Sequence, residues 1–364
     1  MAIIFSQSKA YREEYDLEKI YNLNEENCWL IFKEFRWSGD IFKCPRCECL
    51  DKHYFIVTRK QWTCRDVGCG YRFSVTSKTP FQNRNISFKK LLLLVNYFIV
   101  SPQGISANSL HAFLKTTLRT TYLNICKIRE VLHETRYIAP LQGVVHIDCA
   151  YFSGKPRRAN NRAKTDSYVI NNKLRNRKDA IVPDLKTHPE PWNLDKLQNR
   201  RVVLAIAQIN PTDDKKHNSE RTICEVIMHE KSSIIIPIIA KYVHQDATIM
   251  TDCGNAFNVI RNDLGNEHLK VNHSLQYMTA DDVSNNAAER FFSRMRRAEF
   301  GTYNGMRHQY FELYVSEFVW RNDYRKLTLQ QKYEDVMSRI FKCTLTRFHK
   351  YGQYQNKNLE DFPF

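Results

Sequence analysis

The fold can be predicted from one stretch of the sequence, Val144-Val145-His146-Ile147-Asp148-Cys149-Ala150-Tyr151-Phe152. Its apolar and β-branched residues predict a buried strand, and Asp148 is the acid within it. An ionised carboxylate in an apolar strand is costly unless it binds a cation or a hydrogen-bond donor. The stretch therefore predicts a central strand together with a carboxylate that has a chemical role.

The segments that follow this strand alternate in a definite order. Two more strands come next, and then helix, strand, helix, strand and helix. This order predicts an RNase H-like α/β fold, a mixed sheet with helices. The predicted strands are Arg201–Ile209, Arg221–His229, Ala247–Asp252 and Leu269–Asn272, and the predicted helices are Ser232–Val243, Ala256–Leu264 and Asn286–Arg297.

Such a sheet does its chemistry with acids on the first strand, at the end of the fourth strand and on a helix after the fifth. Here these places hold Asp148, Asp252 and Glu289. Carboxylates that converge from different elements suit Mg²⁺ (or Mn²⁺) ions in phosphoryl transfer. A single acid at a strand end is more often a cap or an ion-pair partner, but three at these places favour a metal site.

Neighbouring polar residues offer other assignments for the third position. Asp281 and Asp282 precede the last helix, and Glu299 lies near its end. Asn286 is three residues before Glu289 and so shares its helix face. We weigh two roles for Asn286 equally, the alignment of a metal-bound water and the N-cap of the helix.

Two cysteine pairs precede the sheet region. Cys44 and Cys47 form the first pair, and Cys64 and Cys69 form the second, with β-patterned residues between the pairs. Four thiolates on two turns predict a zinc ribbon with a structural Zn²⁺ ion. The second pair is separated by four residues where two is commoner, and Cys49 is a spare thiol. The alternative is a set of buried cysteines without metal.

Between the cysteines and the sheet region the apolar spacing is helical. The predicted helices are Ser87–Val100, Ser106–Leu114 and Leu118–Leu132. The last two, joined by a short turn, have a helix-turn-helix outline, and Arg119, Lys127 and Arg129 lie on the candidate recognition helix. An ordinary three-helix packing unit would have the same pattern.

The charge of the chain favours a polyanionic partner. The 364 residues carry 55 Lys and Arg against 39 Asp and Glu, a net charge of +16. Basic proteins gain affinity for DNA by neutralising phosphates, although solubility alone is a simpler explanation. The segment from Lys155 to Arg201 holds thirteen of these basic residues and five acids. It predicts a basic insertion that either contacts DNA or is a solvated loop. The candidate DNA contacts in the insertion and the last helix are Arg157, Arg158, Arg294 and Arg297.

Composition and apolar patterning exclude several classes. With 43% hydrophobic residues and 11 Gly, the chain is neither disordered nor collagen-like. The apolar run Leu91 to Val100 is too short to span a bilayer, and residues 1–16 do not form a secretory signal. Eleven cysteines, four of them in close pairs, favour a reducing compartment. We therefore expect a cytoplasmic protein with no membrane partner and no small-molecule substrate.

These patterns predict five segments. They are a helical lead-in (1–40), the zinc ribbon (41–80), the helix-turn-helix-like segment (85–138), the RNase H-like domain (143–327) with its basic insertion (154–200), and a C-terminal tail (328–364).

Motifs from about residue 20 to residue 327 resemble the ISXO-like insertion-sequence transposases, which carry a zinc ribbon, a helical DNA-binding segment and a DDE catalytic domain. The resemblance rests on Phe35-Arg36-Trp37, Phe42-Lys43-Cys44-Pro45-Arg46-Cys47, Trp62-Thr63-Cys64, Tyr71-Arg72-Phe73-Ser74-Val75-Thr76, Gly104-Ile105-Ser106-Ala107, His146-Ile147-Asp148, Tyr151-Phe152-Ser153-Gly154-Lys155, Thr251-Asp252, His273-Ser274, Asn286-Ala287-Ala288-Glu289-Arg290-Phe291-Phe292, Gly301-Thr302-Tyr303, Glu317-Phe318 and Arg321-Asn322.

The resemblance implies roles for individual residues. Asp148, Asp252 and Glu289 look like the three catalytic acids, Asn286 like a polar neighbour of the third, and His273 like a histidine near the scissile strand. The chain departs from the family pattern at Cys149, where an acid is usual, and in its longer second cysteine turn. Adjacent residues of a strand face opposite ways, so Cys149 leaves the acid site intact.

We therefore predict a DNA transposase that binds the terminal inverted repeats of its element and cuts and joins double-stranded DNA at a metal-dependent DDE site. Because two ends must be cut together, it would act as a homodimer or a higher assembly. Two alternatives stay open. One is a zinc-ribbon and helix-turn-helix regulator with an inactive RNase H-like domain, and the other is a structure-specific nuclease of the same fold.

Overall fold

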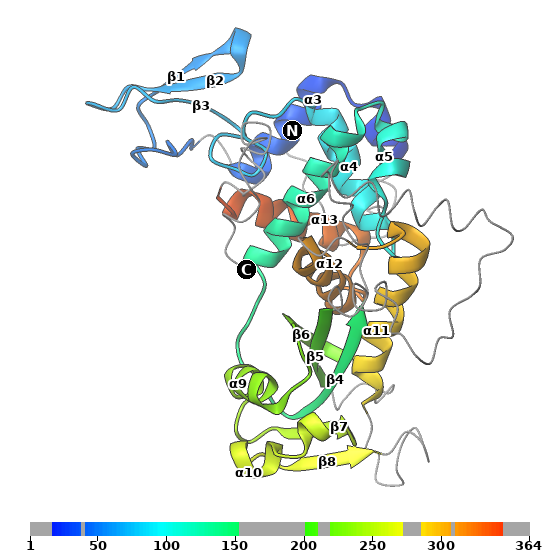
Figure 1. Cartoon of the computed structure of the whole chain (residues 1–364). Coiled ribbons are helices and arrows are strands. Elements are labelled where there is room, and N and C mark those ends of the chain that lie inside the picture. The colour runs from blue at the N-terminus through cyan, green and yellow to red at the C-terminus, as the bar shows by residue number, and fades with distance from the viewer. Residues whose placement is uncertain are drawn as a thin grey trace, which may run out of the picture. The chain divides into compact units, whose positions relative to one another are not determined.

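The computed structural model describes residues 17–37, 41–152, 201–209, 219–271, 285–306 and 310–344 (Figure 1). The chain divides into two compact units. We call Ala139–Tyr314 the sheet unit, and Met1–Ile138 together with Val315–Phe364 the helical unit. Nearly all of the predicted basic insertion lies outside the described residues.

The sheet unit is built on five strands in the order β6-β5-β4-β7-β8 (Figure 1). The strand β4 is central, antiparallel to β5 and parallel to β7. This topology confirms the RNase H-like α/β prediction. The strands are β4 (Val144–Phe152), β5 (Arg201–Ile209), β6 (Ser219–Ile227), β7 (Thr248–Asp252) and β8 (His268–Val271).

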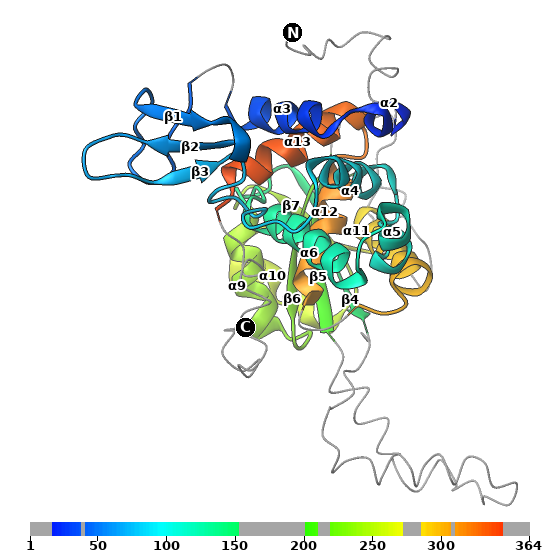
Figure 2. The same ribbon diagram turned by 90° about the horizontal axis from the view of Figure 1, so that it is seen from above.

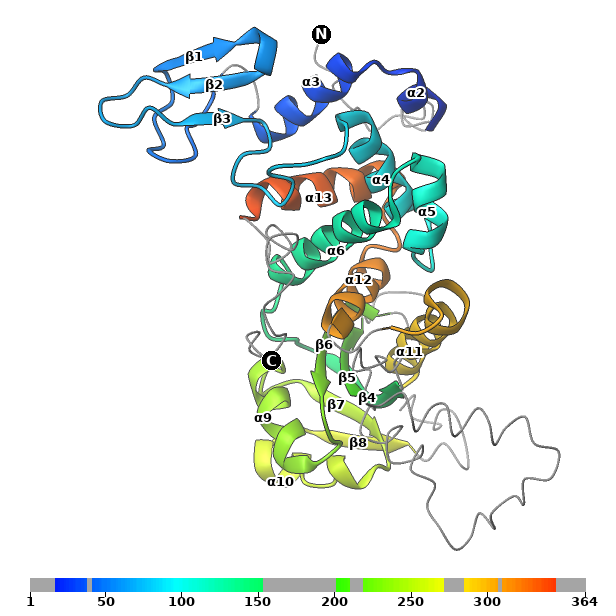
Figure 3. The same cartoon turned by 45° about the horizontal axis from the view of Figure 1, so that its top comes forward.

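Alternate residues of β4 face two different layers. Val145 and Ile147 are fully buried in a core with residues of α9 (Ser232–Tyr242) and α10 (Ile260–Leu264). On the other face, the His146 ring accepts a hydrogen bond from the backbone amide of Ala287 in α11 (Asn286–Ala298) at 3.4 Å. Figure 3 shows α11 on one side of β4 and α9 on the other. Asp148 shares the α11 face, because residues two apart on a strand point the same way.

Two elements of the sheet unit differ from their predictions by more than one residue at a boundary. The predicted helix at 256–264 is a 3-10 turn, η3 (Asn255–Phe257), followed by α10. The third strand begins two residues early, at Ser219. The helix α9 forms although Pro237 lies inside it, as predicted.

The ribbon of the helical unit is a three-stranded antiparallel sheet of β1 (His53–Ile56), β2 (Gln61–Cys64) and β3 (Arg72–Ser74). A short 3-10 turn, η1 (Val57–Arg59), joins β1 and β2. Trp62 of β2 is buried and stacks on Trp29 with ring centroids 5.9 Å apart. Trp29 belongs to α3 (Glu25–Arg36), so this contact joins the ribbon to the helices.

Arg36, at the end of α3, makes a second connection to the ribbon. Its guanidinium donates hydrogen bonds to the backbone carbonyls of Ser74, Val75 and Ser77. Burial lowers its pKa to about 10. Three carbonyl acceptors offset part of the cost of burying the charge.

The remaining elements of the helical unit are α2 (Leu17–Asn22), α4 (Phe88–Val100), α5 (Ala107–Leu114), α6 (Leu118–Glu134), α13 (Leu329–Lys342) and the C-terminal part of α12 (Phe311–Asp323). The three predicted helices of the helix-turn-helix-like segment are thus confirmed. Ser87, Ser106 and Thr117 cap α4, α5 and α6, because each side chain accepts a hydrogen bond from a first-turn amide. Figure 2 shows α13 beside α3.

The helix α13 lies in the segment predicted only as a C-terminal tail. Thr328 and Gln331 form a capping box at its start. Tyr333, Val336 and Met337 bury its apolar face in the same core as α3, α4 and α6. None of the helices in the described ranges is both long and apolar enough to cross a membrane.

Candidate metal and catalytic sites

Four cysteines of the ribbon meet at one point. Cys44 and Cys47 lie on the first turn, and Cys64 ends β2. Cys69 lies on the second turn, which Gly68 helps to close at a φ of +75°. The four sulfurs lie within 4.8 Å of one another, with 3.8 Å from Cys44 to Cys69 and 3.5 Å from Cys47 to Cys64.

This cluster fits a structural zinc ion. Four sulfur ligands suit tetrahedral Zn²⁺ and leave no open coordination position. Burial of the Cys44 thiol opposes ionisation, but backbone amides of Cys47 and Arg46 donate to its sulfur and lower its pKa to about 7. The extra residues of the second turn do not displace Cys64 or Cys69 from the cluster.

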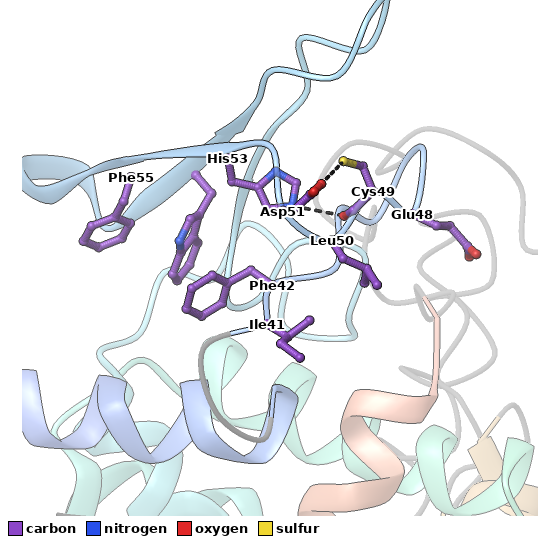
Figure 4. Close-up of a pocket in the computed structure, with 9 residues that line it drawn as sticks. Ile41, Phe42, Glu48, Cys49, Leu50, Asp51, His53 and Phe55 are labelled. Atoms are coloured by element: carbon purple, nitrogen blue, oxygen red, sulfur yellow. Dashed lines mark hydrogen bonds between the residues drawn. The ribbon is translucent and has the colours of Figure 1, made fainter.

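Cys49 is separate from the cluster and lines a pocket of about 830 Å³ (Figure 4). Its thiol lies 3.5 Å from a carboxylate oxygen of Asp51, and its carbonyl lies 3.0 Å from Nε2 of His53. Rings of Phe42, Phe55 and Trp62 form the apolar wall. Among the described lining residues there is neither a cluster cysteine nor any of the three candidate acids.

The sheet register brings the first two candidate acids together. The strands β4 and β7 run parallel and pair His146 with Met250. Two residues further on, strand alternation points Asp148 and Asp252 to the same face, and the charge of Asp252 acts on Asp148. Both side chains are only half-buried. An amide of Cys149 donates to Asp148 Oδ1 at 2.8 Å, and the amide of Gly254 donates to Asp252 Oδ1 at 2.9 Å.

Glu289 approaches these acids from the first turn of α11, the helix that packs on this face. Burial and the charges of the three acids Asp252, Glu289 and Glu230 together raise the pKa of Asp148 to about 7, against the lowering effect of the Cys149 hydrogen bond. The carboxylates therefore share one electrostatic environment. Within the described residues their oxygens do not all approach one another as closely as the cysteine sulfurs do.

Two neighbours of the acids were not predicted from the sequence. Glu230 follows β6 by three residues, and its charge also raises the pKa of the Cys149 thiol. Gly254 follows Asp252 by two residues and hydrogen bonds to it. An acid just after a strand is the signal that could have indicated Glu230, but its proximity to Asp148 depends on strand pairing.

Asn286 is the first residue of α11, and the N-cap position belongs to Asn285. The N-cap role that the sequence allowed for Asn286 is therefore wrong. Asn286 is half-buried, three residues before Glu289.

The candidate DNA-binding cations divide by exposure. Arg119 is exposed in the first turn of α6, Arg297 is exposed on α11, and Arg294 is half-buried. Arg157, Arg158 and His273 lie outside the described residues.

Lys127 and Arg129 do not occupy the exposed positions that DNA contact requires. Arg129 is 2% exposed, and its Nε donates to Glu317 Oε2 at 2.6 Å. Lys127 is 8% exposed, and burial lowers its pKa to about 8. The cause is that α6 is buried on every side from Asn124 to Leu132. The prediction that Lys127 and Arg129 contact DNA is therefore wrong.

Family models match both parts of the chain. Residues 140–323 match the ISXO2-like transposase domain, and residues 23–72 match the transposase zinc-ribbon domain. A Haemophilus influenzae protein named as an uncharacterized transposase-like protein is 28% identical over 97 residues, which are 26% of this chain and 76% of that protein. The domain match covers half of the chain and includes all three candidate acids. The chain therefore belongs to the ISXO2-like transposase family.

Proposed function

We propose that this transposase cuts the DNA ends of its own insertion sequence and joins the freed 3′-hydroxyls to target DNA, with Asp148, Asp252 and Glu289 as its catalytic acids. The observation that carries the proposal is the parallel pairing of β4 with β7, which supports Asp148 and Asp252 as neighbours on the face covered by α11. Glu289 lies in the first turn of that helix.

These carboxylates suit Mg²⁺ or Mn²⁺ as ligands. Oxygen donors are what these hard cations prefer, and half-buried acids that repel one another gain when a cation neutralises them. The raised pKa of Asp148 reflects that repulsion in addition to burial. When bound, two such ions would activate the attacking oxygen and stabilise the leaving oxygen of an in-line displacement. Asn286, three residues before Glu289, would align the attacking water.

The two proposed steps, cleavage and joining, are both phosphoryl transfers. In cleavage, water attacks the phosphorus at the element end, the bond from phosphorus to O3′ breaks, and the 3′-oxygen leaves with a proton. In joining, that 3′-hydroxyl attacks a target phosphodiester, and a target 3′-hydroxyl leaves. Asp148, Asp252 and Glu289 orient both the attacking and the leaving oxygen.

DNA binding would use cations on both units. Exposed Arg119, at the start of the second helix of the helix-turn-helix-like pair, and the zinc ribbon would bind the terminal repeats. Arg294 and Arg297 of α11 would hold phosphates near the acids. We retain Arg157, Arg158 and His273 as proposed contacts on sequence grounds.

The assembly would be a homodimer or larger, because two element ends have to be cut in one event. We place it in the cytoplasm, because a cluster of four thiolates persists best in a reducing compartment.

The test is strand cleavage and joining by the zinc-loaded full chain on labelled duplexes that carry the DNA flanking its gene, with Mg²⁺ or Mn²⁺. We expect end-specific 3′-hydroxyl release and joined product for the wild type, and neither for Asp252→Asn. Asp246→Asn is the matched control, because the Asp246 side chain is 92% exposed before β7. Cleavage without joining would indicate a nuclease, and end binding without cleavage would indicate a regulator.

A further inference from the structure

The segment after β7 holds the Asp252 carboxylate by one oxygen. The Gly254 amide donates to Asp252 Oδ1 at 2.9 Å, and the Thr251 hydroxyl donates to the Asp252 carbonyl at 2.7 Å. The Thr251 hydroxyl also lies 2.9 Å from Nε2 of His268 in β8. Within the described part of the chain, Asp252 Oδ2 has no hydrogen-bond partner. One oxygen is thus fixed, and the other is available to a ligand.

A side chain at position 254 would collide with that fixed oxygen. A Cβ built on Gly254 would lie 2.9 Å from Asp252 Oδ1 and 3.3 Å from the ring of Phe257. Real Cβ atoms essentially never approach other atoms as closely as 2.9 Å. Phe257 is fully buried and its amide donates to the Gly254 carbonyl at 3.1 Å, so it cannot move aside readily. The Asp252 carboxylate is the group that would have to shift.

The backbone gives no other reason for glycine here. Gly254 has φ −59° and ψ 137°, which any residue adopts. Glycines at positive φ, such as Gly265 at +77°, serve the turn itself. At position 254 a side chain would force the Asp252 carboxylate to shift.

We propose that Gly254 is a positioning residue for Asp252: its amide holds Oδ1, and its missing side chain leaves the carboxylate room to present Oδ2 to a divalent cation. This inference rests on the proposed metal-dependent function. It assigns Gly254 no contact with DNA or metal, and its effect is exerted through Asp252 alone.

The first test is Mn²⁺ affinity, measured by the electron paramagnetic resonance signal of free Mn²⁺ during titration of the zinc-loaded full chain. Gly254→Ala should bind Mn²⁺ about 10–100-fold more weakly than the wild type, as is typical when a ligand loses its support. Gly301→Ala is the matched control, because Gly301 has no positive φ and no atom within 4 Å of its built Cβ. An unchanged affinity in Gly254→Ala would overturn the proposal.

A double-mutant cycle of unfolding free energies tests the contact between Gly254 and Asp252 in the absence of metal. Gly254→Ala should cost less free energy of unfolding in an Asp252→Ala background than in the wild type, because the colliding oxygen is gone. Equal costs in the two backgrounds would overturn the proposal. If Gly254→Ala does not fold, the double variant Asp252→Ala/Gly254→Ala should still fold. Failure of the double variant to fold would also overturn the proposal.

The two tests separate this inference from the proposed function. If Asp252→Ala binds Mn²⁺ as tightly as the wild type, the carboxylate metal site is wrong, and the double-mutant cycle still judges the contact between Gly254 and Asp252.

Discussion

At the scale of single residues, burial and neighbouring charge keep the Asp148 carboxyl protonated well above its ordinary range of pH. Its pKa is about 7, against an ordinary 3.8, because burial and the charges of Asp252, Glu289 and Glu230 favour the neutral form. A metal ligand has to be deprotonated, so a cation that binds to the Asp148 carboxyl would displace its proton. Metal binding should therefore release protons near neutral pH.

The pH dependence of stability follows from the same shift. The unfolded chain loses the Asp148 proton near pH 3.8, and the folded chain keeps it to about pH 7. Without added Mg²⁺ or Mn²⁺, the free energy of unfolding should fall as pH rises through this window. Asp148→Asn removes the titration, so it should be more stable than the wild type by about 4 kcal/mol at pH 8 and not at pH 4.

Hydrogen exchange of the β4 amides measures this effect in the sheet unit, because the described tryptophans all lie in the helical unit. A stability difference between Asp148→Asn and the wild type that is equal at pH 4 and pH 8 would contradict the prediction.

The positions of Asp148 on β4 and of Asp252 at the end of β7 agree with the sequence prediction, whereas the expected exposure of two cations does not. Asp148 and Asp252 are recognisable because a strand's alternation fixes their face, and strand order fixes their neighbours. Lys127 and Arg129 look like surface residues of an amphipathic helix. Arg129 is buried against Glu317 of α12, which follows 188 residues later in the chain. No local pattern around α6 carries that information.

At the scale of elements, the helix α12 is anchored by a buried carboxylate. Glu317 is fully buried and accepts from Arg129 at 2.6 Å and from Arg321 at 2.8–2.9 Å. Arg321 also donates to the carbonyl of Phe98 in α4 at 2.6 Å. The network links α4, α6 and α12. Burial disfavours the charge of Glu317, but the two guanidinium groups keep its pKa below the ordinary value.

Removing that charge should destabilise the helical unit strongly. Glu317→Gln leaves two guanidinium groups without their carboxylate, and breaking a buried pair in this way typically costs about 3–5 kcal/mol. Urea unfolding followed by the fluorescence of Trp320, on the same helix, measures the cost. Glu34→Gln is the control, because Glu34 is exposed on α3 of the same unit and should change stability by about 0.5 kcal/mol or less. Equal effects of the two variants would refute the network's role.

We expect the folding of the ribbon to depend on a zinc ion held by the four cysteines. Cys47→Ser should lose zinc and shift the emission of buried Trp62 to longer wavelength, because a four-ligand site contributes directly to folding. Cys49→Ser should keep its zinc, since Cys49 lies outside the cluster. Zinc content and tryptophan emission of the two purified variants test this pair. Loss of zinc from Cys49→Ser with retention in Cys47→Ser would contradict the ligand assignment.

At the scale of the whole molecule, the net charge of +16 favours DNA binding, and the question is which face of the sheet unit contacts the DNA. In the sheet unit the acids and α11 share one face, and α9 covers the other. Arg297 on α11 and Lys241 on α9 are both exposed. They form a matched pair of cations on opposite sides of the sheet.

Arg297→Ala should weaken binding of duplex DNA and reduce the slope of log K against log salt by about 1, since one phosphate contact is lost. Lys241→Ala should leave both quantities near the wild-type values. Fluorescence anisotropy over a series of salt concentrations measures affinity and slope together. A larger effect from Lys241→Ala would place the DNA on the other face.

The claim that Asp148, Asp252 and Glu289 form one catalytic site is tested most directly by an assay of joining. The assay measures how four variants of the full chain join pre-cut element ends to target DNA. They are Asp148→Asn, Asp252→Asn, Glu289→Gln and the triple variant. Catalytic groups that act as one site are strongly non-additive. We predict that each single variant loses about as much joining activity as the triple variant. Joining near the wild-type rate by any single variant would contradict the assignment of these three acids as one catalytic site.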